Sequence, residues 1–165
     1  MRVPVLLLAL TLASCASVRL PADEGATLDP VAFFTGPSRG IGELKVVMAS
    51  PVTITVRSVG RRDGAGGLIL DQAIREGDKP ERTRRWIMRP AGPGRYSGTL
   101  TEATGPVSIS IQGPRAFIAY AMKDGLAVRQ QLALQKDGRT LLNHMTISKY
   151  GVRVARLRET IRKAG

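Results

Sequence analysis

From Val31 onward, apolar and polar positions alternate with a period close to two, and turn residues recur regularly between the alternating segments. The alternation is clearest in Val52-Thr-Ile54-Thr-Val56 and in Val107-Ser-Ile109-Ser-Ile111. Because successive side chains of a strand point to opposite faces, this pattern predicts strands with one buried face each. The predicted strands cover residues 41–48, 52–56, 68–75, 82–88, 95–101, 107–111, 115–122, 126–134, 140–150 and 152–163.

The predicted strands follow one another through short turns, so each is expected to pair with its neighbour in sequence. They indicate an all-β domain of about nine or ten strands, built as a single antiparallel up-and-down barrel or a strongly curled sheet of the lipocalin or calycin type. Closure into a barrel would remove exposed strand edges and enclose an interior. A β-sandwich is the alternative architecture.

Two segments depart from plain alternation. Within Val152 to Lys163 the apolar positions change parity, so that Val154 and Leu157 fall on opposite faces. Either a β-bulge or a terminal helix would explain this change. Residues 33–36, Phe-Phe-Thr-Gly, are expected to plug one end of the domain, where a short helix could form.

The N-terminus has the pattern of a bacterial lipoprotein leader. One positive charge at Arg2 precedes an apolar run that is too short to span a bilayer as a helix, which needs about 20 residues. Leu12-Ala13-Ser14-Cys15 then matches the lipobox, whose cysteine receives diacylglycerol. We predict a signal peptide over residues 1–14, lipidation at Cys15, a flexible tether over residues 15–30 and a β-barrel-like domain over residues 31–165. Alternatively, Cys15 is a buried thiol.

The predicted location of the protein determines which partners its positive net charge could meet. Ala16 follows the cysteine in place of the Asp that commonly retains lipoproteins in the inner membrane, so we expect anchoring at the periplasmic face of the outer membrane. The formal net charge of +12 becomes +11 when Arg2 is removed with the leader. Nucleic acid is then no partner, and the basic surface is expected to meet anionic lipid, a polyanion or an acidic protein.

Composition removes most kinds of catalytic chemistry. The chain has one Cys and one His, so neither a disulfide framework nor a Cys/His metal cluster can form. A nucleophilic triad would need His144, which has no Ser or Cys next to it in the sequence. The glycine-rich segments 40–42 and 64–67 are expected to be turns because neither opens a helix. We predict no enzyme activity, no cofactor and no metal.

Arg84 and Trp86 share one face of a predicted strand. If this face is inward, the guanidinium offers planar, bidentate donors next to an indole ring, which suits an anionic group. If it is outward, Arg84 is part of a solvated surface. Trp86 is the one Trp of the chain, and we favour the inward arrangement.

Three further polar side chains and one cation are candidates for the same interior. Gln72 and Gln130 each place an amide on an otherwise apolar face, where it must be paired or hydrated. Asn143 and Lys149 lie six positions apart and thus on one face, at the two ends of an apolar stretch. They could hold a carboxylate or headgroup. Alternatively, Asn143 satisfies backbone groups and Lys149 extends to water.

The motif Asn143-x5-Lys149-Tyr150-Gly151-Val152, together with Arg84-Arg85-Trp86, resembles an uncharacterised bacterial lipoprotein family, domain of unknown function 3833. The resemblance extends over about Leu28 to Lys163. It implies a periplasmic lipoprotein without an assigned reaction. Many members have an acidic, Trp-containing strand where this chain has Val128-Arg-Gln-Gln-Leu-Ala-Leu134.

These features predict a membrane-anchored protein that binds a small hydrophobic, anionic ligand of the fatty-acyl type. The alternative is a structural or accessory lipoprotein that docks through its basic surface onto an acidic protein or envelope polymer. A lined interior cavity of a few hundred Å³ would favour ligand binding, and a packed core would favour docking.

Overall fold

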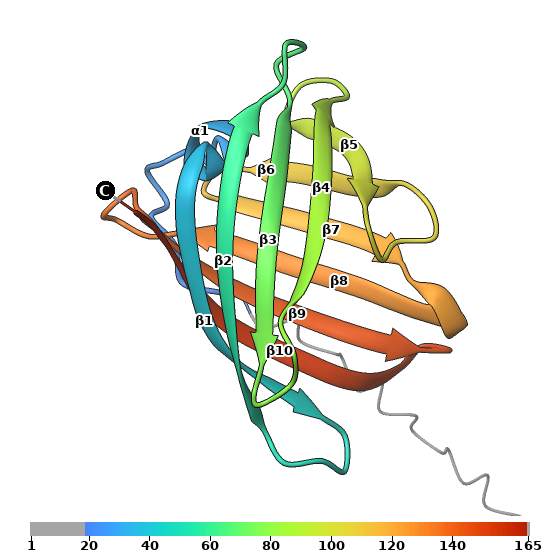
Figure 1. The fold of residues 1–165 in the computed structure, drawn as a ribbon. Coiled ribbons are helices and arrows are strands. Elements are labelled where there is room, and N and C mark those ends of the chain that lie inside the picture. Colours follow the sequence, from blue (N-terminus) through green and yellow to red (C-terminus); the bar gives the residue numbers. More distant parts are fainter. Residues whose placement is uncertain (1–18, 165) are drawn as a thin grey trace, which may run out of the picture.

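The computed structural model describes residues 19–164 and shows ten strands that close into a barrel (Figure 1). The predicted signal peptide and Cys15 lie outside the described residues. The strands are β1 (Gly36–Val46), β2 (Val52–Arg62), β3 (Leu68–Glu76), β4 (Arg82–Pro90), β5 (Arg95–Leu100), β6 (Val107–Gln112), β7 (Arg115–Ala121), β8 (Leu126–Leu134), β9 (Thr140–Lys149) and β10 (Val152–Lys163). A short helix α1 (Pro30–Phe34) precedes β1, and a 3-10 turn η1 (Lys123–Gly125) precedes β8.

The barrel is an antiparallel meander closed by its first and last strands. Each strand pairs with the next in sequence, and β1 pairs with β10 in a register that sets Gly40 opposite Ile161. The prediction of an up-and-down barrel is therefore confirmed, and the sandwich alternative is wrong. Gly40 and Gly42 lie inside β1, so the turn predicted at residues 40–42 is also wrong.

The C-terminal segment is a strand with a bulge. The register between β10 and β9 shifts between Arg153 and Ala155, which moves later apolar residues to the inner face. Of the two explanations for the parity change, the bulge is correct. The bulge places Leu157, Glu159 and Ile161 on the inside of the barrel.

Helix α1 closes one end of the barrel, as predicted from its phenylalanines. The carboxylate of Asp29 accepts a hydrogen bond from the Ala32 amide at 3.0 Å and caps the helix, and Pro30 occupies the first turn. Phe33 and Phe34 are buried, and their rings meet edge to face. A Cβ at Gly60 would lie 1.9 Å from the Phe34 carbonyl oxygen, so this glycine lets the plug approach β2.

The described segment before α1, residues 19–29, is bound to the barrel, which differs from the flexible tether predicted over residues 15–30. The Asp23 amide donates to the Leu134 carbonyl at 2.8 Å, and the Leu28 amide donates to the carbonyl of Gly113 at 2.9 Å. The buried guanidinium of Arg115 pairs with Glu24 at 2.6 Å. Leu28 is itself part of the core, so apolar burial holds this segment in addition to hydrogen bonds.

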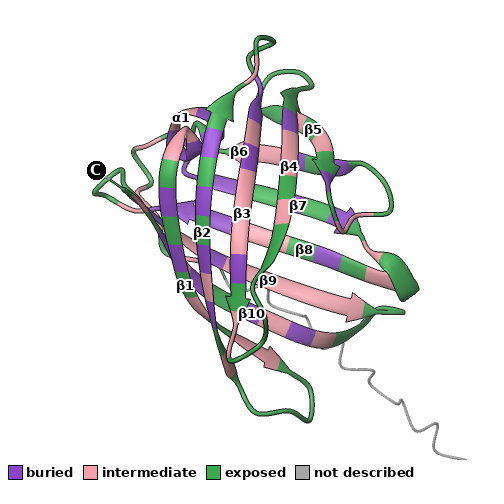
Figure 2. Ribbon diagram, in the orientation of Figure 1, coloured by how far each residue is buried: buried purple, intermediate pink, exposed green. Residues whose placement is uncertain are grey.

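The core fills the barrel in two clusters. Buried and exposed positions alternate along β2, as expected for a sheet with one dry face (Figure 2). The larger cluster extends from α1 across the inner faces of β3 to β10, and the smaller one contains Ile54, Val56, Ile74 and Leu157. Within residues 19–164, no helix is long and apolar enough to cross a membrane.

Candidate functional site

A set of polar side chains crosses the middle of the barrel interior. We call it the polar belt, and it consists of Ser58, Gln72, Arg84, Gln130, Asn143 and Glu159. Each has at least one apolar or glycine neighbour two positions away on its strand, as Trp86 is for Arg84, so strand alternation directs them to the inside. Groups buried in this way must be paired with one another, hydrated or bound to a ligand.

Gln72 on β3 connects the belt to two residues of β4. Its amide oxygen accepts hydrogen bonds from Arg84 Nε at 2.7 Å and from the indole Nε1 of Trp86 at 2.8 Å. Its amide nitrogen donates to the Ser58 hydroxyl on β2 at 2.9 Å. This amide therefore uses both of its ends, and it fixes the orientation of the guanidinium and of the indole.

Arg84 points into the barrel, as the inward arrangement predicted. Its guanidinium carbon lies 5.4 Å from the centroid of the Trp86 ring, within cation–π range. Burial lowers the pKa of Arg84, while Tyr120, Glu102 and Glu159 oppose this shift through their charge. Nε is bonded to Gln72, but the two terminal nitrogens donate to no residue that the structure describes. The interior thus contains a positioned guanidinium with unused donors.

Trp86 forms the wall beside this guanidinium. Its ring meets the ring of Tyr120 edge to face, with centroids 5.8 Å apart. Burial raises the pKa of Tyr120. The two aromatic side chains therefore present an apolar surface next to the charged group.

A carboxylate lies on the opposite side of the barrel. Asn143 Nδ2 on β9 donates to Glu159 Oε2 on β10 at 2.8 Å. Burial raises the pKa of Glu159, although Asn143 and Arg84 act in the opposite direction. Gly40 makes room for this group, because a Cβ there would lie 1.8 Å from Glu159 Oε1.

The belt borders an interior cavity of about 70 Å³. One end of the cavity is apolar and reaches α1 through Pro30 and Phe34; the other end is polar. Asn143 Oδ1 is buried and has no hydrogen-bond partner, and the Gln130 amide, which also lines the cavity, bonds to none of the described residues. The volume is below the roughly 300–1,000 Å³ of typical small-molecule sites, and it has room for a few water molecules.

Of the residues predicted for the site, the structure brings Gln72, Arg84, Trp86, Gln130 and Asn143 to this cavity, but not Lys149. Lys149 is exposed at the end of β9, where its ammonium lies 5.7 Å from the centroid of the Tyr150 ring. His144 lies on the outer face opposite Arg158. Its pKa is lowered mainly by burial, and the positive charges of Arg158, Arg156 and Arg153 lower it further.

Sequence reasoning missed Glu159 and Ser58. Glu159 lies midway between Leu157 and Ile161 at the same parity, so a signal was present: an acidic residue in an otherwise apolar alternation. Ser58 continues the alternation of Ile54 and Val56 in the same way.

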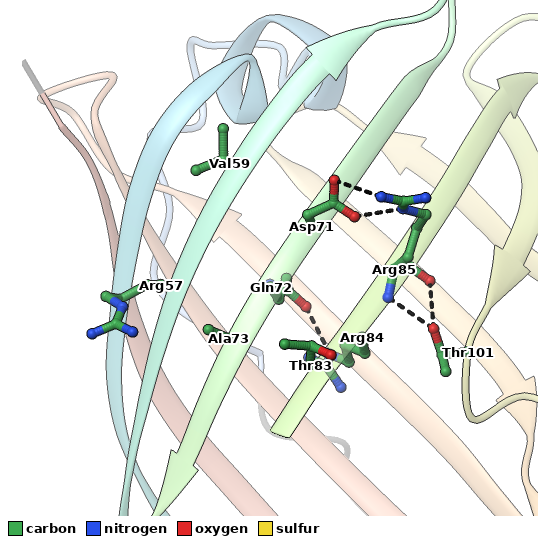
Figure 3. Close-up of a pocket in the computed structure, with 9 residues that line it drawn as sticks. All are labelled: Arg57, Val59, Asp71, Gln72, Ala73, Thr83, Arg84, Arg85 and Thr101. Atoms are coloured by element: carbon green, nitrogen blue, oxygen red, sulfur yellow. Dashed lines mark hydrogen bonds and ion pairs between the residues drawn. The ribbon is translucent and has the colours of Figure 1, made fainter. Parts of the chain in front are cut away.

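A second, larger space lies on the outer surface of β2, β3 and β4. This open groove of about 570 Å³ has Ala73 and Thr83 at its floor, and charged side chains surround it (Figure 3). Two of the three arginines that line it already have carboxylate partners, and the third, Arg84, belongs to the polar belt described above. Arg85 pairs with Asp71, whose pKa it lowers, and Arg57 pairs with Glu81 at 3.0 Å. The interior cavity, with its unpaired donors, is the better candidate for a binding site.

Comparisons with known proteins agree with the fold. The family model described as "Protein of unknown function (DUF3833)" matches residues 9–163. None of the curated proteins that were compared matches the sequence.

Three solved structures share the barrel. A protein of unknown function from the DUF3598 family of Nostoc punctiforme has a TM-score of 0.64 and 13% identity, and the match covers 84% of this chain and 50% of that one. The S-type phycobiliprotein lyase CPES from Guillardia theta has a TM-score of 0.66 and 7% identity, with 82% of this chain and 90% of that one covered. Rv2717c from M. tuberculosis has a TM-score of 0.63 and 16% identity, with 84% of this chain and 99% of that one covered. The chain thus spans half of the length of the Nostoc protein. At these identities the similarity shows the fold alone.

Proposed function

We propose, for a chain that belongs to the DUF3833 family, that its barrel binds a small hydrophobic ligand with an anionic head, of the fatty-acyl type. The observation that carries this proposal is the guanidinium of Arg84, held inside the barrel by Gln72 with its terminal nitrogens unused. A guanidinium presents parallel N–H donors that match a carboxylate or a phosphate. The anionic head is therefore placed at Arg84, against the Trp86 ring.

The remaining groups of the polar belt suit such a head. The nitrogen of the Gln130 amide supplies a further donor at the same cavity. The raised pKa of Glu159 favours its neutral form, which reduces its repulsion of an anion. The apolar end of the cavity then receives the start of the ligand's apolar part.

The size of the cavity sets a condition on this function. About 70 Å³ accommodates a head group but not an acyl chain, so a long chain binds only if Phe34 and the α1 plug move. The fold similarity to a phycobiliprotein lyase supports a barrel that handles a small molecule. Because that neighbour is a lyase, the expectation that this chain is not an enzyme stays a prediction.

The test is a titration of the full-length protein with sodium hexanoate and sodium decanoate, read by the fluorescence of Trp86. Arg84→Gln is expected to weaken binding about 10-fold or more, since a hydrogen bond to a charged group contributes about 1.5–3 kcal/mol. Arg82→Gln is the matched control: Arg82 lies two positions away on the same strand and is exposed, paired with Glu102. Equal affinities of the two variants, or no fluorescence change with either acid, would overturn the proposal.

A second candidate is docking to a polyanion through the outer surface, which the small cavity favours. Arg162, Arg39 and Arg57 lie directly opposite one another on β10, β1 and β2, where like charges repel. A bound polyanion would relieve this repulsion. Salt-dependent retention on dextran sulfate should fall for Arg39→Gln and stay unchanged for Arg84→Gln. If Arg39→Gln is retained as strongly as the wild type, this surface is excluded as the polyanion site.

We also propose lipidation at Cys15 and anchoring at the periplasmic face of the outer membrane, on the basis of the lipobox. Metabolic labelling with an alkyne fatty acid, followed by membrane fractionation, tests both. The label should be found in the outer-membrane fraction and be lost in Cys15→Ala. Label retained by Cys15→Ala, or found in the inner membrane, would contradict the respective part.

A further inference from the structure

Exposed apolar side chains gather at the end of the barrel opposite α1. Of the eight large apolar side chains that are exposed within residues 19–164, five lie on two hairpins, and we call these five the apolar rim: Val46, Val47, Met48, Tyr150 and Val152. The hairpins are neighbours, because the Val47 amide donates to the Val154 carbonyl at 2.9 Å. Met48 is 100% exposed and Tyr150 86%, and both tips are solvent-facing in Figure 2. Such a concentration marks an interaction surface.

The backbone at both tips is strained. Met48 has φ +63° and Tyr150 has φ +50°, a conformation that residues with a Cβ rarely adopt. Lys149 pairs with Val152, so Tyr150 and Gly151 form a two-residue turn with positive φ at both positions. Asn-Gly is the favoured sequence in such a turn. The exposed ring of Tyr150 therefore does not serve the stability of this hairpin.

Cations flank the apolar rim on the same hairpin. Residues 147–156 contain Lys149, Arg153 and Arg156 and no acidic residue. Arg153 and Arg156 form no ion pair with the described part of the chain. In the adjacent turn, Lys123 and Asp124 balance each other in charge. Aliphatic and aromatic side chains at the hairpin tips, next to unpaired cations, suit the surface of a bilayer, where apolar acyl chains lie just below the phosphates.

We propose that the apolar rim docks on a bilayer that contains anionic phospholipids. Met48 and the valines enter the boundary between headgroups and acyl chains, Tyr150 lies at headgroup level, and the cations contact lipid phosphates. The α1 end of the barrel then faces away from the membrane. This docking rests on the hairpins alone and depends neither on the ligand nor on lipidation at Cys15.

The test places a tryptophan at one tip of the full-length protein. Met48→Trp is compared with Ala65→Trp, the same residue introduced in the exposed β2–β3 turn at the opposite end. Each is mixed with vesicles of phosphatidylcholine and phosphatidylglycerol with brominated acyl chains, and the signal of Trp86 is subtracted with the unchanged protein. We expect quenching and a blue shift at position 48 and neither at position 65. Equal quenching at both positions, or none at position 48, overturns the proposal.

Two further variants and one control test the chemistry of the contact. Arg153→Gln should weaken vesicle affinity about fivefold, as expected for one cation near an anionic surface, whereas Arg95→Gln at the other end should not. Tyr150→Asn should lower quenching at position 48 while leaving the barrel folded, because asparagine suits the turn. Unchanged affinity in Arg153→Gln, or equal quenching on phosphatidylcholine alone, overturns the assignment to anionic lipid.

Discussion

Replacement of Gln72 by Leu removes three hydrogen bonds at one position inside the barrel. The amide of Gln72 bonds to Arg84, Trp86 and Ser58 at 2.7–2.9 Å. Leucine keeps a similar volume but leaves the indole N–H, the guanidinium Nε and the Ser58 hydroxyl without this partner. An orphaned buried polar group costs about 1–3 kcal/mol. The added burial of apolar surface and hydration of the guanidinium offset part of that cost.

We therefore expect Gln72→Leu to lower the free energy of unfolding by about 2–4 kcal/mol. For a chain of this length, such a loss lowers Tm by about 5–12 °C. Equilibrium unfolding in urea, followed by far-ultraviolet circular dichroism, measures the change, and the fluorescence of Trp86 reports the loss of its hydrogen bond separately.

Gln130→Leu is the matched control, since it makes the same chemical change at the same cavity. The Gln130 amide has no hydrogen bond to the described residues, so its replacement should change stability by less than about 1 kcal/mol. The reasoning is refuted if the two variants lose the same stability, or if Gln72→Leu stays within about 0.5 kcal/mol of wild type.

Three further predictions follow from the surroundings of Glu159 and His144. Gly40→Ala should destabilise the barrel by about 1–3 kcal/mol in urea unfolding, because its Cβ would overlap the Glu159 carboxylate; Gly64→Ala, in open space, should be neutral, and equal effects would contradict this account. Burial raises the pKa of Glu159 in the folded state, so its stabilising contribution is complete below the unfolded-state pKa and is lost as the pH rises through the folded-state pKa. Between pH 4 and pH 8, Glu159→Gln should therefore lose less stability than the wild type. If the free energies of unfolding of the two proteins change in parallel with pH, the pKa of Glu159 is not raised. The pKa of His144, lowered by burial and by arginines such as Arg158, should rise toward its ordinary value in high salt, as seen in an NMR titration; no change would mean that the arginines play no part.

The sequence predicted the meander well because most of its strands alternate between apolar and polar residues and its turns contain glycine, proline or aspartate. It predicted β1 only from Ile41, although the strand begins at Gly36. The residues 36–40, Gly-Pro-Ser-Arg-Gly, show no apolar alternation, and at Gly40 the carboxylate of Glu159 takes the space of a side chain. A strand that makes room for a side chain of its partner shows no hydrophobic alternation.

The candidate site was predictable as a face but not as a network. Parity alone brought Gln72, Arg84 and Trp86 to the interior, yet it gave no partner for any of them. The contact between Asn143 and Glu159 depends on the β9–β10 register, which sets these two residues opposite each other. Lys149 lies outside the cavity because it is the last residue of β9, and strand parity does not predict where a strand ends.

The closing pair of strands also determines how the chain must fold. Gly40 lies opposite Ile161, 121 residues later, so the barrel cannot close before nearly all of the chain is available. Until then β1 and β10 are bare edges that can pair with other chains. Contacts between residues so distant in sequence make folding slow, on the millisecond-to-second scale typical of all-β domains. Loss of the last twelve to fourteen residues would remove β10 and leave one edge of β1 and one edge of β9 unpaired, so an incomplete chain should aggregate instead of forming a smaller barrel.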